Sequence, residues 1–284
     1  MRAPVGLVLA FCAALSAPAR AQQAAGDADA TDGVRADGAF FDGFDGLDRD
    51  RWYVSDGWTN GDHQSCLWQQ DRVRVADGRL RLSLESLPGG DPPLACAEIQ
   101  SNARFAYGTF EARMKVPYAV GLNANMFTYI GPPQNKPHQE IDFEFIAPDG
   151  PSLQTNVHFD GQDPRPELLE MEEDGAFRTY SMIWEPERIR WFIDGVQIRE
   201  ARGGSIPDEA QKLYLSLWSS DRLTGWMGDF EARNAPQVLE VDWVAYSPPG
   251  SDCRFEGSVL CGDAAADRRD GADAGDPGGA RPEG

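Results

Sequence analysis

Three carboxylates occupy every second position of the stretch HQEIDFEF, residues 138–145: Glu140, Asp142 and Glu144. The residues between and after them are apolar. Because successive side chains of a strand point to opposite sides, this two-residue period predicts a β-strand with one acidic and one apolar face. Like charges on one strand face repel each other, so the acidic face indicates a use beyond folding.

Paired carboxylates can cut a glycosidic bond, one acting as nucleophile and the other as general acid. Cα atoms four residues apart along a strand are separated by roughly 13 Å, whereas retaining glycosidases hold their two carboxyl groups about 5–5.5 Å apart. Glu140 and Glu144 can approach that separation only if their side chains lean together over a concave sheet, with Asp142 beneath the gap. Negative neighbours raise a carboxyl pKa, so one glutamate can stay protonated while the other stays ionised.

The same residues allow simpler interpretations. The acidic row could be a solvated strand face, or it could bind a divalent metal ion through its carboxylates. His138 and His158 could carry a proton or bind a metal, although a hydrogen-bonding wall of a cleft is the more common role. His63, beside Asp62, is interpreted as exposed or as part of a cleft loop.

Seven of the eight tryptophans divide into two groups by their position. Four stand at predicted strand ends or in loops, where an aromatic face can stack on a sugar ring: Trp58, Trp68, Trp218 and Trp226. Three alternate with aliphatic residues inside predicted strands and are expected in the core: Trp184, Trp191 and Trp243.

Segments with a two-residue period fill most of the middle of the chain. The stretch RVRVADGRLRLSLES, residues 72–86, alternates around an Ala-Asp-Gly turn and predicts a β-hairpin. Residues 180–201 repeat the pattern with two turns. Further strands are expected at 105–116, 123–130, 139–147, 153–160, 212–219 and 238–246, and the only predicted helix is a turn or two near Pro207–Gln211. Many short strands with frequent turns predict an antiparallel β-sandwich.

Both ends of the chain differ from this middle part. Residues 1–21 combine an early arginine, a short apolar run and an Ala-Arg-Ala site, as in a secretory signal peptide. Residues 22–38 and 263–284 contain too few large apolar side chains to offset the entropy of ordering, and both are predicted to be disordered. The folded domain is therefore expected over 39–262, in a protein released to the periplasm or the medium.

Four cysteines follow the predicted signal peptide: Cys66, Cys96, Cys253 and Cys261. In an exported protein this number suggests two disulfides, and the sequence alone allows three pairings. We favour Cys66–Cys96 and the short loop Cys253–Cys261.

The charge balance restricts the possible partners. Without Arg2 and Arg20, 24 basic residues stand against 46 acidic ones, a net charge of −22. Such a surface repels phosphate backbones and anionic lipids, so nucleic-acid and membrane partners are disfavoured. A neutral polymer fits better, although the acidity can also simply maintain solubility outside the cell.

Several motifs follow one another in an order similar to that of bacterial lichenases, over roughly residues 40–246. Besides HQEIDFEF, they are WYVSDGWTNGDHQSCLW, ARFAYGTFEARMKV, GLNANMFTYIGP, IRWFIDG and LSLW…GWMGDF. The chain thus resembles glycoside hydrolase family 16, the laminarinase and lichenase superfamily. Its uninterrupted Glu-x-Asp-x-Glu spacing resembles the lichenase and xyloglucan-transglycosylase branch. CRFEGSVLC, KPHQEIDFE and RDRWYVSDGW resemble the rhizobial glycanases that trim succinoglycan.

The resemblance implies roles for individual residues. Glu140 matches the nucleophile, Asp142 the assisting aspartate and Glu144 the general acid/base. The residues that match a glucan-binding cleft are Asn60, Glu98, Phe127, Tyr129, Asn156, Trp218 and Trp226. Cys66 and Cys96 match the disulfide of lichenases. No cofactor is implied for catalysis, but a structural calcium ion on the convex face would use backbone oxygens of Gly43 and Gly78 and the carboxylate of Asp242.

Four positions depart from the lichenase pattern. His138 stands in place of a tryptophan, His158 of another aromatic residue, Ser216 of an asparagine and Gln100 of an arginine. We place both histidines among the substrate-binding residues. Because these four positions concern sugar binding rather than bond cleavage, the preferred substrate can differ from an unmodified mixed-linkage glucan.

The strand pattern and the resemblance together predict an all-β, concanavalin A-like jelly-roll sandwich of two curved antiparallel sheets, with an open cleft on the concave face. The expected activity is retaining endo-hydrolysis, by a monomer, of a β-1,3-1,4-type glucan or a bacterial exopolysaccharide such as succinoglycan. A transglycosylase using the same cleft and a non-catalytic, lectin-like carbohydrate-binding domain are the alternatives.

Overall fold

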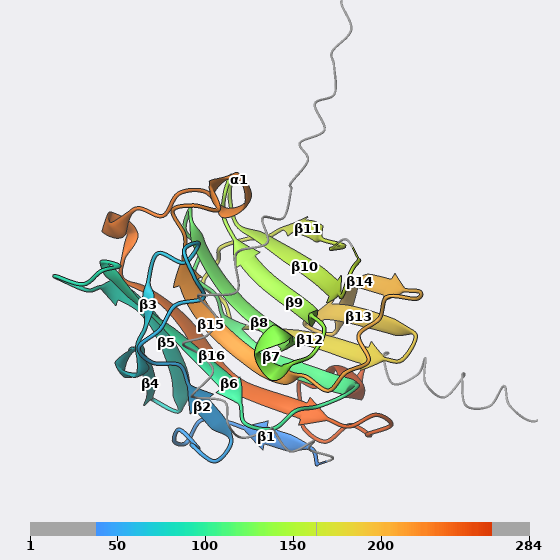
Figure 1. Cartoon of the computed structure of the whole chain (residues 1–284). Helices are drawn as coiled ribbons and strands as arrows, with labels where there is room; N and C mark the ends of the chain where they lie inside the picture. Colours follow the sequence, from blue (N-terminus) through green and yellow to red (C-terminus); the bar gives the residue numbers. More distant parts are fainter. Residues whose placement is uncertain (1–37, 163, 263–284) are drawn as a thin grey trace, which may run out of the picture.

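The computed structural model describes residues 38–162 and 164–262 (Figure 1). The predicted signal peptide 1–21, the segment 22–38 except Gly38, and the acidic tail 263–284 lie outside the described residues.

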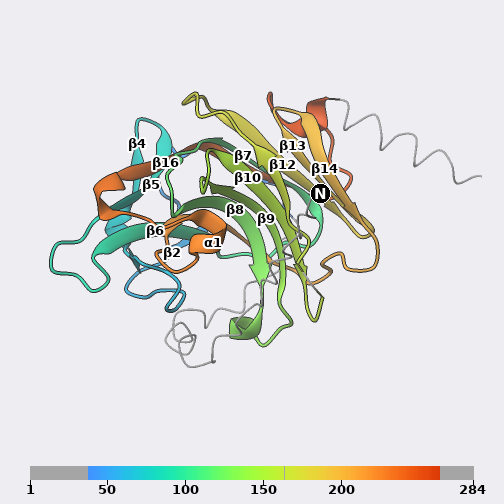
Figure 2. The same ribbon diagram turned by 90° about the horizontal axis from the view of Figure 1, so that it is seen from above.

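Seven strands form the sheet that carries the acidic residues, called the front sheet below. The main path runs β11-β10-β9-β8-β15-β6, and β2 pairs with β6. Their bounds are β2 Trp52–Val54, β6 Leu94–Ser101, β8 Leu122–Ile130, β9 Gln139–Ile146, β10 Ser152–Phe159, β11 Glu167–Glu170 and β15 Lys212–Ser219. The neighbours along this path pair antiparallel, and β8, β9 and β10 are visibly curved in Figure 2.

Eight strands form the second, back sheet. The path runs β5-β16-β7-β12-β13-β14, with β4 on β5 and β1 on β16. Their bounds are β1 Phe40–Asp42, β4 Val73–Ala76, β5 Arg79–Ser86, β7 Gly108–Lys115, β12 Arg178–Glu185, β13 Arg188–Ile193, β14 Val196–Arg202 and β16 Gln237–Ser247. The two sheets are joined at one edge, where the end of β5 pairs with the start of β6. The two-residue strand β3, Leu67–Trp68, is an exception, because it pairs parallel with β6.

The core lies between the two sheets and explains the apolar face of β9. Phe143 and Phe145 are almost fully buried, and both make edge contacts with Tyr180 of the back sheet. Trp191 of β13 is fully buried and donates its indole N–H to the backbone oxygen of Asp142 at 3.1 Å. The back sheet therefore fixes the backbone of the acidic strand. The predicted β-sandwich is confirmed, and Trp184, Trp191 and Trp243 are buried as expected.

The predicted helix near Pro207–Gln211 is wrong. Its backbone groups have partners outside the segment: the N–H groups of Asp208 and Glu209 both donate to the side-chain oxygen of Gln139, and Pro207 accepts from Trp184. Among the described residues the α-helical segment is α1, Thr224–Met227, and four three-residue 3₁₀ turns accompany it: η2 Gln70–Arg72, η3 Pro132–Gln134, η4 Ala232–Asn234 and η5 Val259–Cys261.

Strand β6 was not predicted from the two-residue period. All eight of its residues are buried: β15 and β2 flank the strand, and its Glu98 and Gln100 side chains lie at the bottom of a cleft. Its sequence, LACAEIQS, consequently mixes small, apolar and polar residues without alternation. The two disulfides form as favoured, Cys66–Cys96 and Cys253–Cys261.

Candidate active site

The pairing register of the front sheet arranges its side chains in three rows that cross the strands. From β10 to β8, the first row is His158–Glu140–Tyr129, the second Asn156–Asp142–Phe127 and the third Gln154–Glu144–Asn125. Strand β15 extends them with Lys212, Tyr214 and Ser216, and β6 adds Gln100 to the second row and Glu98 to the third. Paired residues of neighbouring strands share one face of a sheet. The acidic side chains therefore belong to a continuous polar and aromatic surface.

An open cleft of about 670 Å³ is lined by the members of these rows on β9, β8, β15 and β6. Its lining includes all three acidic residues of β9 and six of the nine predicted substrate-binding residues: Asn60, Glu98, Phe127, Tyr129, His138 and Trp218. Polar and aromatic groups are mixed on its walls, as suits a ligand with hydroxyl groups and flat apolar faces. The strands β8 and β9, whose side chains line the cleft, are curved (Figure 2).

Glu140 lies beside two stacked histidines. His138 Nε2 is 2.7 Å from Glu140 Oε2, and the imidazole rings of His138 and His158 stack with centroids 5.0 Å apart. Burial lowers the pKa of His138, but the hydrogen bond and the charge of Glu140 outweigh burial, and the pKa is raised. Burial lowers the pKa of His158. Glu140 thus has a partner that becomes cationic more readily than an ordinary histidine.

Glu144 lies among neutral amides. Gln154 Nε2 donates to Oε2 at 2.8 Å, and Asn123 Nδ2 donates to Oε1 at 3.3 Å. Burial raises the pKa of Glu144 to about 8, and the charge of Glu140 adds to this effect, while the two amide donors oppose it. At neutral pH the Glu144 carboxyl is therefore mostly protonated.

Asp142 lies between the two glutamates and is 2 % exposed. Burial raises its pKa well above the usual range, and the charges of Glu140 and Glu144 raise it further. Interaction with the Glu140 carboxyl group contributes to this rise. Asp142 is thus positioned to share a proton with Glu140.

Glu98, at the far end of the third row, is another buried carboxyl group. Burial raises the pKa of Glu98 to about 7, although hydrogen bonds from Ser55 and Gln100, at 2.6 and 3.2 Å, and the charge of Lys212 oppose this. Lys212 also donates to Gln100 at 3.4 Å. This corner of the cleft offers several polar groups for sugar hydroxyls.

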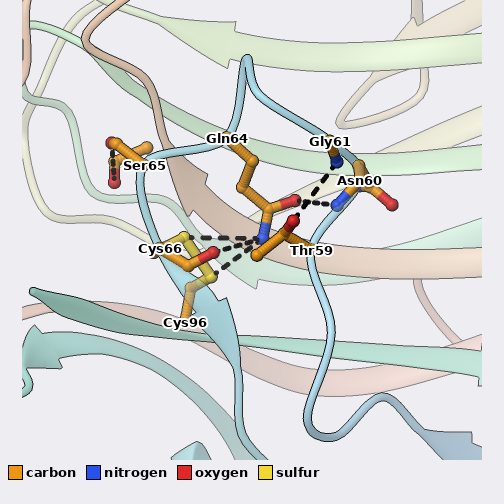
Figure 3. Close-up of a disulfide and its surroundings, with 8 residues drawn as sticks. Thr59, Asn60, Gly61, Gln64, Ser65, Cys66 and Cys96 are labelled. Carbon is orange, nitrogen blue, oxygen red and sulfur yellow. Dashed lines mark hydrogen bonds between the residues drawn. A yellow bond between two sulfur atoms is a disulfide. The ribbon is translucent and has the colours of Figure 1, made fainter. Parts of the chain in front are cut away.

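The loop that closes one side of the cleft is held by a disulfide (Figure 3). Cys66 is bonded to Cys96, which lies two residues before Glu98 on β6. The Gln64 amide donates to the backbone oxygen of Cys66 at 2.8 Å and accepts from the backbone N–H of Asn60 at 3.0 Å. The disulfide therefore positions the loop that brings Asn60 and His63 to the cleft.

Three predicted binding residues lie behind or beside the cleft lining. Asn156 is buried, and its amide nitrogen is 3.0 Å from His158 Nε2. Trp226 donates its indole N–H to Gln154 at 3.1 Å and lies 6.4 Å from Trp218, between ring centroids. The geometry thus gives Asn156 and Trp226 support roles toward His158 and Gln154.

Two observations on aromatic residues refine the sequence analysis. Trp68 is fully buried and packs edge-on against Trp58, so it belongs to the core, whereas Trp58 lines the cleft. His63 also lines the cleft and contacts Trp218 edge-on, with ring centroids 5.9 Å apart.

Several residues of the site were not predicted from the sequence. They are Tyr53, Asn123, Asn125, Gln154, Lys212 and Tyr214, together with the turn η3 at the rim. For Asn123 and Asn125 a signal existed, because LNANMF places polar residues at every second position of a strand. The others lack such a signal, since only the register of pairing brings them to Glu140 and Glu144.

The residues that match a calcium site converge on the back sheet. Asp242 lies at a bulge of β16, where its pairing passes from β5, which follows Gly78, to β1, which precedes Gly43. Its carboxylate is already engaged: Arg113 is 2.6 Å away and Arg79 3.6 Å away. Two guanidinium groups at the only charged ligand do not fit a bound cation.

Comparisons with known proteins identify the family of the chain. The family model described as "Glycosyl hydrolases family 16" matches residues 60–245. The endo-1,3-1,4-beta-glycanase ExoK of Rhizobium meliloti (strain 1021) is 43% identical over 227 residues, 78% of this chain and 84% of the relative. A beta-glucanase of Bacillus subtilis (strain 168) is 32% identical over 221 residues, 77% of this chain and 90% of the relative.

A solved structure has the same architecture. The beta-glucanase of Bacillus licheniformis superposes with a TM-score of 0.70 at 29% identity, covering 75% of this chain and 99% of that chain. Among the residues that the structure describes, no helix has the length and apolar character needed to cross a membrane.

Proposed function

This chain belongs to glycosyl hydrolase family 16, and we propose that it is a retaining endo-β-glucanase that cuts internal bonds of a β-1,3-1,4-type glucan or a bacterial exopolysaccharide such as succinoglycan. The observation that carries the proposal is the contrast between two carboxyls on one face of β9. Glu144 keeps its proton to a pH of about 8, while Glu140 accepts a hydrogen bond from a histidine whose pKa is raised.

In the first step, the Glu140 carboxylate attacks the anomeric carbon of the sugar on one side of the bond. The carbon–oxygen bond to the leaving sugar breaks, and the Glu144 carboxyl gives its proton to the departing oxygen. The product is an ester between the sugar and Glu140. Asp142 supports this step, because its raised pKa lets it donate a hydrogen bond to Glu140 and orient the attacking oxygen.

In the second step, Glu144 acts as a base. The charge of Glu140 contributes to the raised pKa of Glu144, and that charge is gone while Glu140 is esterified. The pKa of Glu144 then falls, so that the carboxylate can take a proton from water. The hydroxyl adds to the anomeric carbon, Glu140 is released and the original configuration is retained.

The remaining cleft residues bind the polymer. Trp58 and Trp218 offer aromatic faces to sugar rings, and Asn60 and Glu98 offer polar groups to hydroxyls. Because the cleft is open, a long chain can enter it along its length, which suits cleavage at internal positions. The relatives are described as an endo-1,3-1,4-beta-glycanase and as beta-glucanases, which supports this substrate class.

Other aspects of the proposal follow from the same features. The mechanism uses side chains alone, and we assign no step to calcium, since the Asp242 carboxylate is paired with arginines. The two disulfides support secretion to the periplasm or the medium. We propose that the protein acts as a monomer on polysaccharide, with residues 39–262 as its single domain.

The test is incubation of the protein with lichenan, laminarin, xyloglucan and succinoglycan, with viscosity and new reducing ends followed over time. We expect rapid viscosity loss on one of them before many reducing ends appear, and a β-configured product in early NMR spectra. An α-configured product would contradict the retaining mechanism, and inactivity on all four polymers would contradict the proposal. Longer products after addition of acceptor oligosaccharides would indicate a transglycosylase instead, and binding without cleavage would indicate a lectin-like domain.

A further inference from the structure

Two histidines beside Glu140 carry out no bond-making or proton-transfer step of the proposed hydrolysis. His138 and His158 surround Glu140, and His138 Nε2 is 2.7 Å from Glu140 Oε2. One ligand atom from each of these three residues can be chosen so that all three atoms lie within 4.8 Å of one another. Among the described residues, this is the group of histidine, cysteine and acidic side chains with the spacing of a metal site.

The backbone itself brings the three side chains together. His158 on β10 is directly opposite Glu140 on β9. His138 comes two positions before Glu140 and therefore lies on the same side of the sheet, as its stacking on His158 shows. No loop has to move for the three groups to meet.

Two imidazoles and one carboxylate are the ligand set of many zinc sites. Zinc–ligand bonds of about 2.0–2.2 Å in tetrahedral geometry put ligand atoms roughly 3.3–3.5 Å apart, so small side-chain rotations would close the cluster around an ion. Calcium and magnesium prefer sites made only of oxygen ligands. The cluster therefore favours late first-row transition metals over alkaline-earth ions.

The cluster can also be reached from solvent. The side chains of His138, His158 and Glu140 are 41%, 27% and 20% exposed. An ion can enter from the cleft, and water can complete its coordination.

We propose that His138, Glu140 and His158 form a binding site for a divalent transition-metal ion such as zinc, and that the bound ion switches the cleft off. A Glu140 oxygen that is bonded to the metal cannot attack an anomeric carbon, and the ion fills the space beside it. The inhibitory part of this proposal rests on the proposed role of Glu140. The binding part does not.

The test combines metal binding with activity. The full chain is dialysed against zinc sulfate and the bound zinc is measured, and polymer hydrolysis is then assayed at the same zinc concentrations. We expect one bound zinc ion per chain, inhibition over the same concentration range, full recovery on addition of a chelator, and no inhibition by equal calcium or magnesium. A chelator alone should leave activity unchanged, which separates this site from a metal that catalysis requires.

Substitutions locate the site. His138→Trp and His158→Tyr keep an aromatic ring at each position, and each should weaken zinc binding and inhibition by roughly 100-fold or more, because even the loss of a hydrogen-bonding partner of a metal ligand costs about 10–100-fold in affinity. His63→Ala is the matched control, because His63 lines the same cleft outside the cluster and its loss should leave zinc binding unchanged.

The outcomes separate the two proposals. Wild-type protein that hydrolyses polymer but binds no zinc in the micromolar range would overturn this inference alone. Zinc binding that His138→Trp and His158→Tyr both retain would also overturn it. If the protein binds zinc through these residues but cleaves no polymer, the proposed function fails and the metal site stands.

Discussion

Glu140 and Glu144 lie on the same face of strand β9 but have different neighbours. Beside Glu140 stands His138 at 2.7 Å, whose pKa is raised and which can become cationic, with the ring of His158 stacked on it. Around Glu144 stand neutral amides, from Gln154 and Asn123. Identical side chains thus receive opposite surroundings four residues apart on one strand.

Under the proposed function, this difference would let one strand perform acid and nucleophilic chemistry together. A neighbouring cation favours the ionised form of a carboxyl group, whereas burial without a cation favours the neutral form. The strand supplies the alternation, and the contrast comes from His138 directly before it and from residues of β8 and β10.

The largest effect should come from removing either carboxyl. Glu140→Gln and Glu144→Gln should each lower kcat on polymer by roughly 10³-fold or more, because one lacks the nucleophile and the other the general acid. Kinetics on polymer and on a dinitrophenyl oligosaccharide provide the measurement.

The dinitrophenyl substrate separates the two roles. Its leaving group departs without a proton, so Glu144→Gln should still release a burst of dinitrophenol, whereas Glu140→Gln should not. A burst from Glu140→Gln and none from Glu144→Gln would reverse the assignment.

The pH profile should show which glutamate keeps its proton. Because the first step needs protonated Glu144, kcat/KM should fall about tenfold per pH unit above its pKa of about 8. The measurement is the initial rate on soluble polymer from pH 5 to 10, with substrate well below KM. A rate that already falls through pH 5 to 6 would show that Glu144 is not held protonated.

The pH dependence of the unfolding free energy should also reflect the raised pKa of Glu144. In the unfolded chain Glu144 ionises above its usual value of 4.5, while in the folded protein it stays neutral to about 8. Its contribution to the unfolding free energy is therefore complete below pH 4.5 and is lost as pH rises to about 8. Glu144→Gln avoids this loss. Its unfolding free energy at pH 8.5 should therefore exceed that of the wild type by on the order of a few kcal/mol.

Thermal unfolding of both proteins at pH 4.5 and 8.5 measures this difference. The gain of Glu144→Gln at pH 8.5 should shrink toward zero at pH 4.5. Glu187→Gln, at an exposed turn, is the control and should show no pH-dependent difference. Equal differences at both pH values for Glu144→Gln would contradict the raised pKa.

The smallest effect should come from the amides. The hydrogen bond from Gln154 lowers the pKa of Glu144, so Gln154→Leu should move the basic limb of the pH profile upward by about one unit. Ser216 is connected to Glu144 only through hydrogen bonds with Asn125 and Asn123, so Ser216→Ala should move the basic limb of the pH profile less. A downward shift for Gln154→Leu would contradict the assigned donor.

The sequence predicted the strand better than its surroundings. The two-residue period of β9 placed Glu140, Asp142 and Glu144 on one face, and the structure confirms this because Phe143 and Phe145 need the opposite, buried face. Gln154 and Lys212 could not be found this way. Their place in the site depends on pairing between strands, which no period within a single strand encodes.

The incorrect predictions also arise from contacts between segments that are far apart in the sequence. Strand β6 lacks alternation because it is covered on both faces, and the residues near Pro207 do not form a helix because Gln139 receives two of their backbone N–H groups. The match to a calcium site depended on a single carboxylate, and its pairing with Arg113 is visible only in the folded structure.

The spacing between strands of the front sheet is also similar to the spacing between sugars in a polymer. Neighbouring strands of a sheet are about 4.8 Å apart, close to the length of one sugar ring. Under the proposed function, a chain lying along the third row would meet a new strand with nearly every sugar, from Glu144 on β9 to Glu98 on β6. Each strand would then contact one sugar position, so that selection among linkages and substituents would be altered one strand at a time, without changing Glu140 and Glu144.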